Sequence, residues 1–290
     1  MVQSQNLSVA DSLKMVGKEH LIKAQYYRWF QTFEVPQTSQ RLAHHMEILS
    51  DGVKIVTQNG PIHGEEGMKG FLSYVEKWRN SHHVGEIDVR KGENDSYILE
   101  ADIKYQNILP DSTKNNYKLH YYTELTTSED SDMPVFNLIE LLPIENLGSG
   151  GFIDAYAENR SKSLIHYWFY ILDNFEGNEQ KVKELLAENF EFHLFDKTAT
   201  DYGQFVQLIK ESHKEVEAYF HAPKDINILQ LEKDVYSISF DLEWHGVTKD
   251  DKRIVGVVHQ DWMLANNPDE RFAKIKDIRI KQIEPFHKIN

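Results

Sequence analysis

The sequence predicts an α+β protein made of two tandem domains, each with three helices packed on a strongly curved and mostly antiparallel sheet. Three observations lead to this prediction: segments repeat at a spacing of about 139 residues, a glycine-rich stretch lies near the middle, and helices precede strands in each copy. A chain of 290 residues is also long enough for two domains of ordinary size.

The repeat is clearest in two strand-like runs. Four positions match at one spacing of 139 residues, namely Asp95 with Asp234, Tyr97 with Tyr236, Asp102 with Asp241, and Tyr105 with Trp244. Residues 49–55 match residues 186–192 at a spacing of 137, and residues 33–34 are matched with residues 175–176 at 142. Insertions and deletions in loops explain this drift. Because the period far exceeds that of a solenoid unit, each copy is expected to be a complete domain.

A glycine-rich segment over residues 146–151 marks the boundary between the copies, because such composition is typical of a flexible linker. Domain 1 is therefore predicted over residues 1–146 and domain 2 over residues 147–290. Two like domains in one chain can make the contact that separate subunits would make. We accordingly expect a pseudo-dimer within the chain, and a homodimer of whole chains stays open.

Each copy is expected to begin with a long apolar and aromatic helix, because large residues such as Leu164 and Trp168 recur at helical spacing. In chain order, the helices are predicted over residues 19–33, 39–49 and 65–80 in the first copy, and over residues 155–175, 178–187 and 202–218 in the second. Thr38 or Ser39 and Asn178 are candidate N-caps of the second helices. A short strand precedes the third helix, and three or four strands joined by polar turns complete each copy.

Alternation within two predicted strands indicates which face of each sheet is buried. Apolar and polar side chains alternate over residues 97–105 and again over residues 236–244. Tyr105 and Trp244 belong to the apolar, inward faces. Asp102 and Asp241 lie on the polar faces, where we interpret them as surface residues.

Three helices followed by a bent sheet resemble the nuclear transport factor two-like superfamily, which includes ketosteroid isomerase, scytalone dehydratase and the SnoaL-like polyketide cyclases. The resemblance covers both copies and rests on the aromatic first helix, the short strand after the second helix, and the run Gly60-Pro-Ile-His-Gly64 before the third. The second copy departs from this pattern at residues 197–201. The resemblance implies cone-shaped domains with a pocket between the helices and the sheet.

The same resemblance implies positions for pocket residues. Counting along the isomerase pattern places hydrogen-bond donors at Tyr26, Trp168, Tyr121 and His259. It places the general base at Thr57 and Leu194, and neither side chain takes up a proton near neutral pH. Each pocket is thus expected to keep donors and to lack the base of an isomerase.

Four residues are candidate catalytic groups. His83 is matched with His221, and both are candidate acid or base groups because scytalone dehydratase-like members carry a pocket histidine in this region; the alternative is a loop histidine that faces solvent. His259 and Asp261 share one face of a strand, where a carboxylate can hold a histidine in the tautomer that a base needs.

Composition and motifs exclude several other classes of function. The net charge of −14, with no basic stripe, argues against nucleic acid as a partner. Cysteine is absent, and the fourteen histidines do not follow the spacing of a metal site, so we expect no metal and no cofactor. Neither a signal peptide nor a membrane span is predicted, so a cytoplasmic location is expected.

Three functional hypotheses follow, and whether the protein is an enzyme stays open among them. The first is a binding protein whose pockets hold a small apolar ligand against Tyr26, His83, Tyr105, Tyr121, Trp168 and Trp244. The second is a SnoaL-like lyase, isomerase or cyclase that uses His259 with Asp261, or His221, as acid or base. The third is a protein-interaction module.

Overall fold

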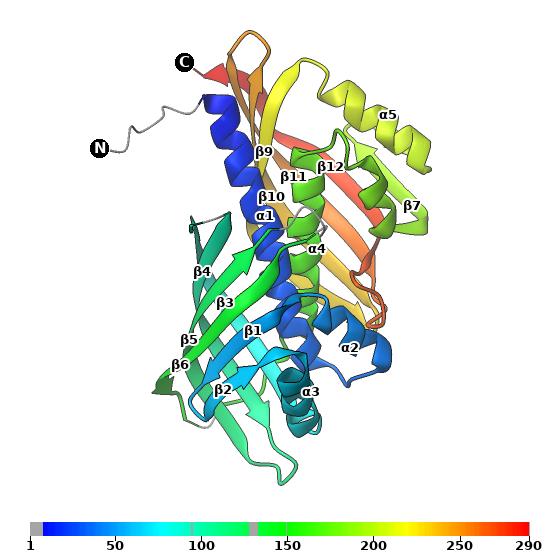
Figure 1. The fold of residues 1–290 in the computed structure, drawn as a ribbon. Helices are drawn as coiled ribbons and strands as arrows, with labels where there is room; N and C mark the ends of the chain where they lie inside the picture. Colours follow the sequence, from blue (N-terminus) through cyan, green and yellow to red (C-terminus); the bar gives the residue numbers. More distant parts are fainter. Residues whose placement is uncertain (1–7, 94, 128–132, 149, 290) are drawn as a thin grey trace, which may run out of the picture. The chain divides into compact units, whose positions relative to one another are not determined.

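The computed structural model describes residues 8–93, 95–127, 133–148 and 150–289, so Ser149 of the predicted linker lies outside the described residues. The elements of the first half are α1 (Val9–Gln31), the 3-10 helix η1 (Thr32–Glu34), α2 (Ser39–Met46), β1 (Leu49–Thr57), β2 (Gly60–His63), α3 (Gly64–Val75), β3 (Arg79–Lys91), β4 (Ser96–Ile108), β5 (Lys114–Thr126) and β6 (Val135–Asn146). Figure 1 shows these elements from blue to green along the chain.

The second half repeats this order, with a 3-10 helix in the place of α2 and no separate counterpart of η1. Its elements are α4 (Tyr156–Asp173), the 3-10 helix η2 (Glu179–Glu184), β7 (Leu186–Leu194), β8 (Lys197–Ala199), α5 (Tyr202–Ser212), β9 (Val216–Glu232), β10 (Val235–Thr248), β11 (Arg253–Ala265) and β12 (Lys274–Ile289).

Each half forms one six-stranded sheet, and the two sheets have the same topology. The strand orders are β2-β1-β6-β5-β4-β3 and β8-β7-β12-β11-β10-β9. The pairs β1–β6 and β12–β7 are parallel, and the other pairs are antiparallel. The predicted α+β architecture with two like, mostly antiparallel sheets is confirmed.

The cores follow the alternation that the sequence predicts. In β10, Tyr236, Ile238, Phe240 and Leu242 are each 1% exposed, and the residues between them are partly exposed. A bulge follows Val84 in β3, where a Cβ added at Gly85 would lie 2.8 Å from the carbonyl oxygen of Asp102. Such bulges bend the strand at that point.

The helices differ from the prediction in length. The second helix of the second half was expected over residues 178–187 but is the six-residue 3-10 helix η2, and Asn178 makes no side-chain cap. Thr38 does cap α2, by accepting from the backbone N–H of Arg41 at 3.2 Å. The predictions for the third helices extend too far, because β3 and β9 begin sooner. No helix in the described part of the chain has the length and apolar character that a bilayer crossing requires.

Contacts divide the chain into two compact units that are discontinuous in sequence. Unit 1 combines residues up to His20 with residues 164–267 and 272–290, and unit 2 combines residues 21–163 with residues 268–271. Helix α1 therefore contributes its first part to unit 1 and the rest to unit 2, whereas α4 does the reverse. The domain boundary at residue 146 stays a prediction about the repeat along the sequence.

Candidate functional site

Unit 2 contains a buried pair of a carboxylate and a histidine. Glu34 ends η1, and its Oε1 atom lies 3.2 Å from Nδ1 of His82 on β3. The Glu34 side chain is fully buried and that of His82 is 7% exposed. Asn159 of α4 completes the arrangement, because its Nδ2 lies 3.0 Å from both Glu34 oxygens and 2.9 Å from the His82 carbonyl.

Unit 1 contains an equivalent pair. Asp173 ends α4, and its Oδ1 atom lies 2.5 Å from Nδ1 of His221 on β9. The side chains are 1% and 7% exposed, respectively. His20 of α1 is the third residue here, with its Nε2 atom 2.7 Å from the His221 carbonyl.

The two pairs are copies of one arrangement, since corresponding residues are all 139 positions apart. The correspondences are Glu34 with Asp173, His82 with His221, Asn159 with His20, and Phe30 with Phe169. The ring centroid of Phe30 is 5.1 Å from that of His82, and the ring centroid of Phe169 is 5.0 Å from that of His221. We call Glu34–His82 the unit 2 dyad and Asp173–His221 the unit 1 dyad. In each, the first helix of one repeat supplies the carboxylate, and the first helix of the other repeat supplies the third residue.

Burial dominates the electrostatics of both dyads. It lowers the pKa of His82 and the pKa of His221 to about 3, with the neighbouring His83 adding to the effect on His82. Burial also raises the pKa of the Glu34 and Asp173 carboxyls well above the ordinary value. At Glu34, the N–H groups of Asn159 and His82 act in the opposite direction.

This geometry suits proton transfer. One proton is shared between Nδ1 of the histidine and the carboxyl, which fixes the orientation of the ring. The other nitrogen, Nε2, makes no hydrogen bond to any described residue in either dyad. A histidine held in this way can accept or donate a proton at Nε2 while the carboxyl compensates the change in charge.

Aromatic side chains and a pocket lie beside the dyads. The Tyr105 ring is stacked 4.9 Å from that of His82, and Trp244 is the β10 residue paired in register with His221. A pocket of about 310 Å³ in unit 2 is lined by Phe33, Glu34, Val35, Pro36, Gln37, Leu72, Val75, Glu76, Lys77, Trp78 and Arg79. The Phe33 ring is 5.9 Å from that of His82, so the pocket adjoins the unit 2 dyad.

The other aromatic candidates lie in the cores. Tyr26, Tyr121 and Trp168 are at most 2% exposed. The hydroxyl of Tyr26 is buried with no hydrogen-bond partner among the described residues, and burial raises its pKa well above the ordinary value. By the spacing of the dyads, Trp168 corresponds to Trp29, so the match of residues 33–34 with residues 175–176 was wrong.

His83 lies next to the unit 2 dyad but on the opposite side of β3, because successive strand residues face opposite ways. Its Nε2 atom lies 3.1 Å from the Ile153 carbonyl and its Nδ1 atom 3.6 Å from Glu158, which raises the pKa of His83. His82, one residue earlier, occupies the position of His221. The predicted match of His83 with His221 was therefore wrong by one residue.

His259 and Asp261 lie on the outer face of the unit 1 sheet, and not on the apolar face where His259 was expected. The buried residues of β11, such as Gln260 and Trp262, alternate with them along the strand. His259 Nδ1 is 2.7 Å from Asp241, which raises the pKa of His259, and its Nε2 is 3.3 Å from Asp261. His120 and Asp102 make the same outer pair in unit 2, at 2.9 Å.

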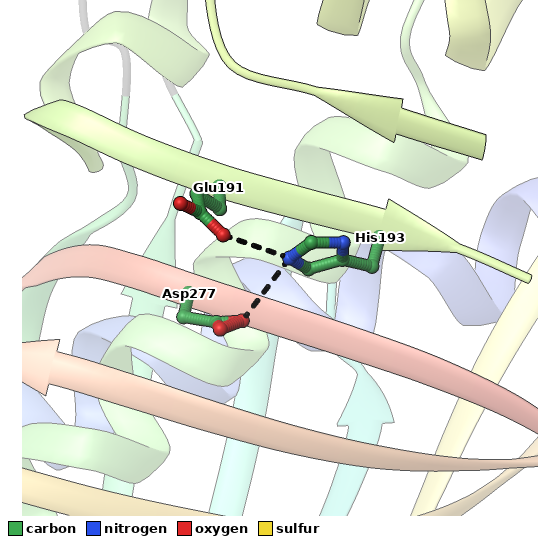
Figure 2. Close-up of side chains that lie close together, drawn as sticks. All are labelled: Glu191, His193 and Asp277. Atoms are coloured by element: carbon green, nitrogen blue, oxygen red, sulfur yellow. Dashed lines mark hydrogen bonds and ion pairs between the residues drawn. The ribbon is translucent and has the colours of Figure 1, made fainter. Parts of the chain in front are cut away.

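One cluster on the outer face of unit 1 has atoms that could hold a cation. Figure 2 shows Glu191 and His193 of β7 beside Asp277 of β12, and their ligand atoms lie within 4.8 Å of one another. However, Arg279 Nε donates to both Asp277 oxygens, at 2.9 and 3.2 Å. A fixed positive charge thus already neutralises part of this cluster, and an ion-pair network accounts for it.

Sequence reasoning singled out His221, Tyr105 and Trp244 near the dyads but missed their other members. Glu34 was used only to mark the end of the first helix, and His82, Asp173, Asn159 and His20 were not named as candidate site residues. The signal that could have found them is the constant spacing of 139 residues, which relates each dyad residue to its counterpart.

No protein-family model matches the sequence, and no curated protein matches it. Among solved structures, a protein provisionally called an aromatic ring hydroxylase from Novosphingobium aromaticivorans is 12% identical, over 48% of this chain and 96% of that chain, with a TM-score of 0.42. A hexachlorocyclohexane dehydrochlorinase from Novosphingobium barchaimii is 10% identical over 46% and 89%, with a TM-score of 0.40. A nuclear transport factor two-like superfamily protein from Salmonella enterica is 13% identical over 41% and 85%, with a TM-score of 0.36. The superfamily named from the sequence is thus among those that the comparisons return.

Proposed function

We propose that this protein is a small-molecule enzyme that transfers protons at its buried histidine–carboxylate dyads. The reaction class is an elimination or isomerisation that begins with removal of a proton from carbon. His82 Nε2 takes the proton, and Glu34 stabilises the positive charge that develops on the ring.

The observation that carries this proposal is the occurrence of the same dyad in both units. A buried ionisable pair contributes little to stability, because the cost of removing charge from water offsets the attraction between the partners. Apolar side chains would fill the same space at least as well. That both repeats nevertheless contain the pair, with a third polar residue beside each carboxyl, supports a chemical role.

The surroundings support a mostly apolar substrate. Six of the residues that line the pocket beside the unit 2 dyad have apolar or aromatic side chains: Phe33, Val35, Pro36, Leu72, Val75 and Trp78. A volume of about 310 Å³ accommodates a one-ring or two-ring molecule. Arg79 and Lys77 at the same pocket can bind a polar group on such a substrate.

A model elimination tests the proposal without knowledge of the natural substrate. A nitrobenzisoxazole opens to a coloured phenolate when a base removes its ring C–H proton and the N–O bond breaks. We expect the protein to accelerate this reaction over buffer, and His82→Gln to lower the rate by about a hundredfold, which is typical of the loss of a positioned base.

The matched control is His120→Gln, which removes an outer-face histidine that also contacts a carboxylate. Its rate should equal that of the unaltered protein. If His82→Gln and His120→Gln react alike while both remain folded by circular dichroism, the dyad is not a base.

A second candidate function is ligand binding without chemistry. The buried hydroxyl of Tyr26, to which no described residue is hydrogen-bonded, favours it. A donor in an apolar surround can orient the acceptor group of a ligand. Ligand-induced thermal stabilisation that is lost in Tyr26→Phe, combined with no turnover of the model substrate, would support this alternative.

A further inference from the structure

The two dyads differ in how their carboxyl oxygens are satisfied. In unit 2, the Asn159 amide donates to both oxygens of Glu34, and the backbone N–H of His82 donates to Oε1 at 2.7 Å. Both oxygens of Glu34 therefore accept hydrogen bonds. This set of donors favours the ionised carboxylate and acts against burial, which raises the pKa of Glu34 as it does that of Asp173, so the assignment to Glu34 rests on the hydrogen bonds to both of its oxygens.

In unit 1, the corresponding residue cannot do the same. His20 Nε2 lies 2.7 Å from the His221 carbonyl but 3.9 Å from Asp173 Oδ2, beyond hydrogen-bond distance. Because a carbonyl only accepts, this Nε2 atom carries a hydrogen that is directed away from Asp173. The other nitrogen of His20 is also engaged, since its Nδ1 atom lies 2.8 Å from Nδ1 of His166.

Asp173 Oδ2 is consequently buried and has no hydrogen-bond partner among the residues that the structure describes. A charged oxygen left in this state costs considerably more than a neutral one. A proton on Oδ1 removes the charge and is shared with His221 Nδ1 across 2.5 Å. The unsatisfied atom is then the carbonyl oxygen of a neutral carboxyl group.

We propose that the two dyads rest in opposite protonation states, so that the unit 2 dyad is a general base and the unit 1 dyad is a general acid. In unit 2, Glu34 is ionised, His82 carries its proton on Nδ1, and Nε2 is free to accept. In unit 1, Asp173 is neutral and donates to Nδ1, so His221 carries its own proton on Nε2.

The acid step in unit 1 balances as a paired proton shift. The Nε2–H bond of His221 breaks as its proton moves to a basic atom of the bound molecule. At the same time the proton on Asp173 Oδ1 moves to Nδ1, so that the ring stays neutral and the carboxyl becomes charged. The use of this acid rests on the proposed function, whereas the protonation states themselves do not.

Other titratable groups surround Asp173, and they do not reverse this assignment. Burial is the largest effect and raises the pKa of Asp173, while His20 and the backbone N–H of His221 lower it to a smaller extent. Burial also raises the pKa of Tyr219, which lies on the same strand as His221, so this residue is neutral. Burial likewise lowers the pKa of His213, which packs near His221, to about 3.

The test exchanges the third residues between the units. Infrared spectroscopy detects a neutral buried carboxyl by its C=O stretching band, and ¹⁵N spectra of labelled histidine distinguish the two ring tautomers. At neutral pH we expect one carboxyl band that disappears in Asp173→Asn and persists in Glu34→Gln, with His221 protonated on Nε2 and His82 on Nδ1. His20→Asn should supply the missing donors and remove the band, and Asn159→His should create a second band.

The same tautomer for His82 and His221, or a band that persists in Asp173→Asn, would overturn the proposal. If the spectra agree with it but the model elimination is not accelerated, the protonation states stand and the proposed function fails. If His20→Asn does not fold, the conservative variant His20→Gln, whose amide can also donate, answers the same question.

Discussion

Unit 1 and unit 2 contain the same dyad, but its third residue is His20 in one and Asn159 in the other. The carboxyl and the histidine ring occupy the same places in both, as the shared spacing of 139 residues requires. The amide donates to both carboxyl oxygens, whereas the imidazole leaves Asp173 Oδ2 with no hydrogen-bond partner in the described part of the chain. A repeated geometry can thus carry two different chemical states, and a single neighbouring residue decides which.

The largest effect is expected from replacing the carboxyl of the base. Glu34→Gln should lower the rate of the model elimination by about a hundredfold, since the charge that stabilises the protonated ring is lost. Asp173→Asn should change this rate little, because the unit 1 dyad does not remove the proton. Equal losses in the two variants, measured by absorbance of the phenolate, would show that the units act alike.

Replacing the histidine should lower the free energy of unfolding more in the unit 2 dyad than in the unit 1 dyad. His82→Ala removes a neutral hydrogen-bond donor from the buried, ionised Glu34, and leaving a buried charge without its partner typically costs about 3 kcal/mol or more. We therefore expect the free energy of unfolding to fall by a similar amount. His221→Ala leaves a neutral Asp173 and should cost less. Urea unfolding of both variants makes the measurement.

The double variant Glu34→Leu/His82→Leu is the control for this comparison. Because no charge stays buried and Asn159 keeps its bond to the residue 82 carbonyl, we expect stability within about 1 kcal/mol of the starting protein. A large loss in the double variant would assign a structural role to the pair.

A third histidine, His45, lies outside both dyads, so replacing it should show how burial of a histidine alone affects stability. It is fully buried in unit 2, neither ring nitrogen is hydrogen-bonded to a residue that the structure describes, and burial lowers its pKa to about 3. His45→Phe removes these unsatisfied atoms and should raise the free energy of unfolding at neutral pH by about 1 kcal/mol.

In the same variant, we expect the free energy of unfolding to depend less on pH. His45 binds a proton more readily in the unfolded chain, whose histidine pKa is about 6.5. Stability is therefore lost as the pH falls from that value toward 3, at up to about 1.4 kcal/mol per pH unit for this group. Acid unfolding curves of His45→Phe should be flatter over this window, and an unchanged slope would refute the assignment.

The smallest effects are expected on the outer faces. His120→Ala and His259→Ala remove exposed pairs with Asp102 and Asp241, and each should change the free energy of unfolding by less than about 0.5 kcal/mol. The contribution of His259 is present below pH 6.5 and is lost as the pH rises through its raised pKa. An effect as large as that of His82→Ala would mean that the outer pairs are more than surface contacts.

The fold was more predictable than the site. Strand alternation and the repeat of Asp102 and Asp241 depend on local spacing, which the sequence displays directly, and the two like sheets followed from them. The dyads join residues 48 positions apart, at a helix end and within a strand, so their contact depends on how each helix packs. Asn159 and His20 come from the opposite repeat, and no local pattern indicates that exchange.

The pH–rate profile of the model elimination tests most directly whether the buried dyad is the base. It should be recorded on His221→Gln, in which only the unit 2 dyad is intact. Because burial lowers the pKa of His82 to about 3, we predict a rate that is constant from about pH 8 to about pH 5. A rate that instead falls with an apparent pKa near about 6.5, as for an exposed histidine, would contradict the account.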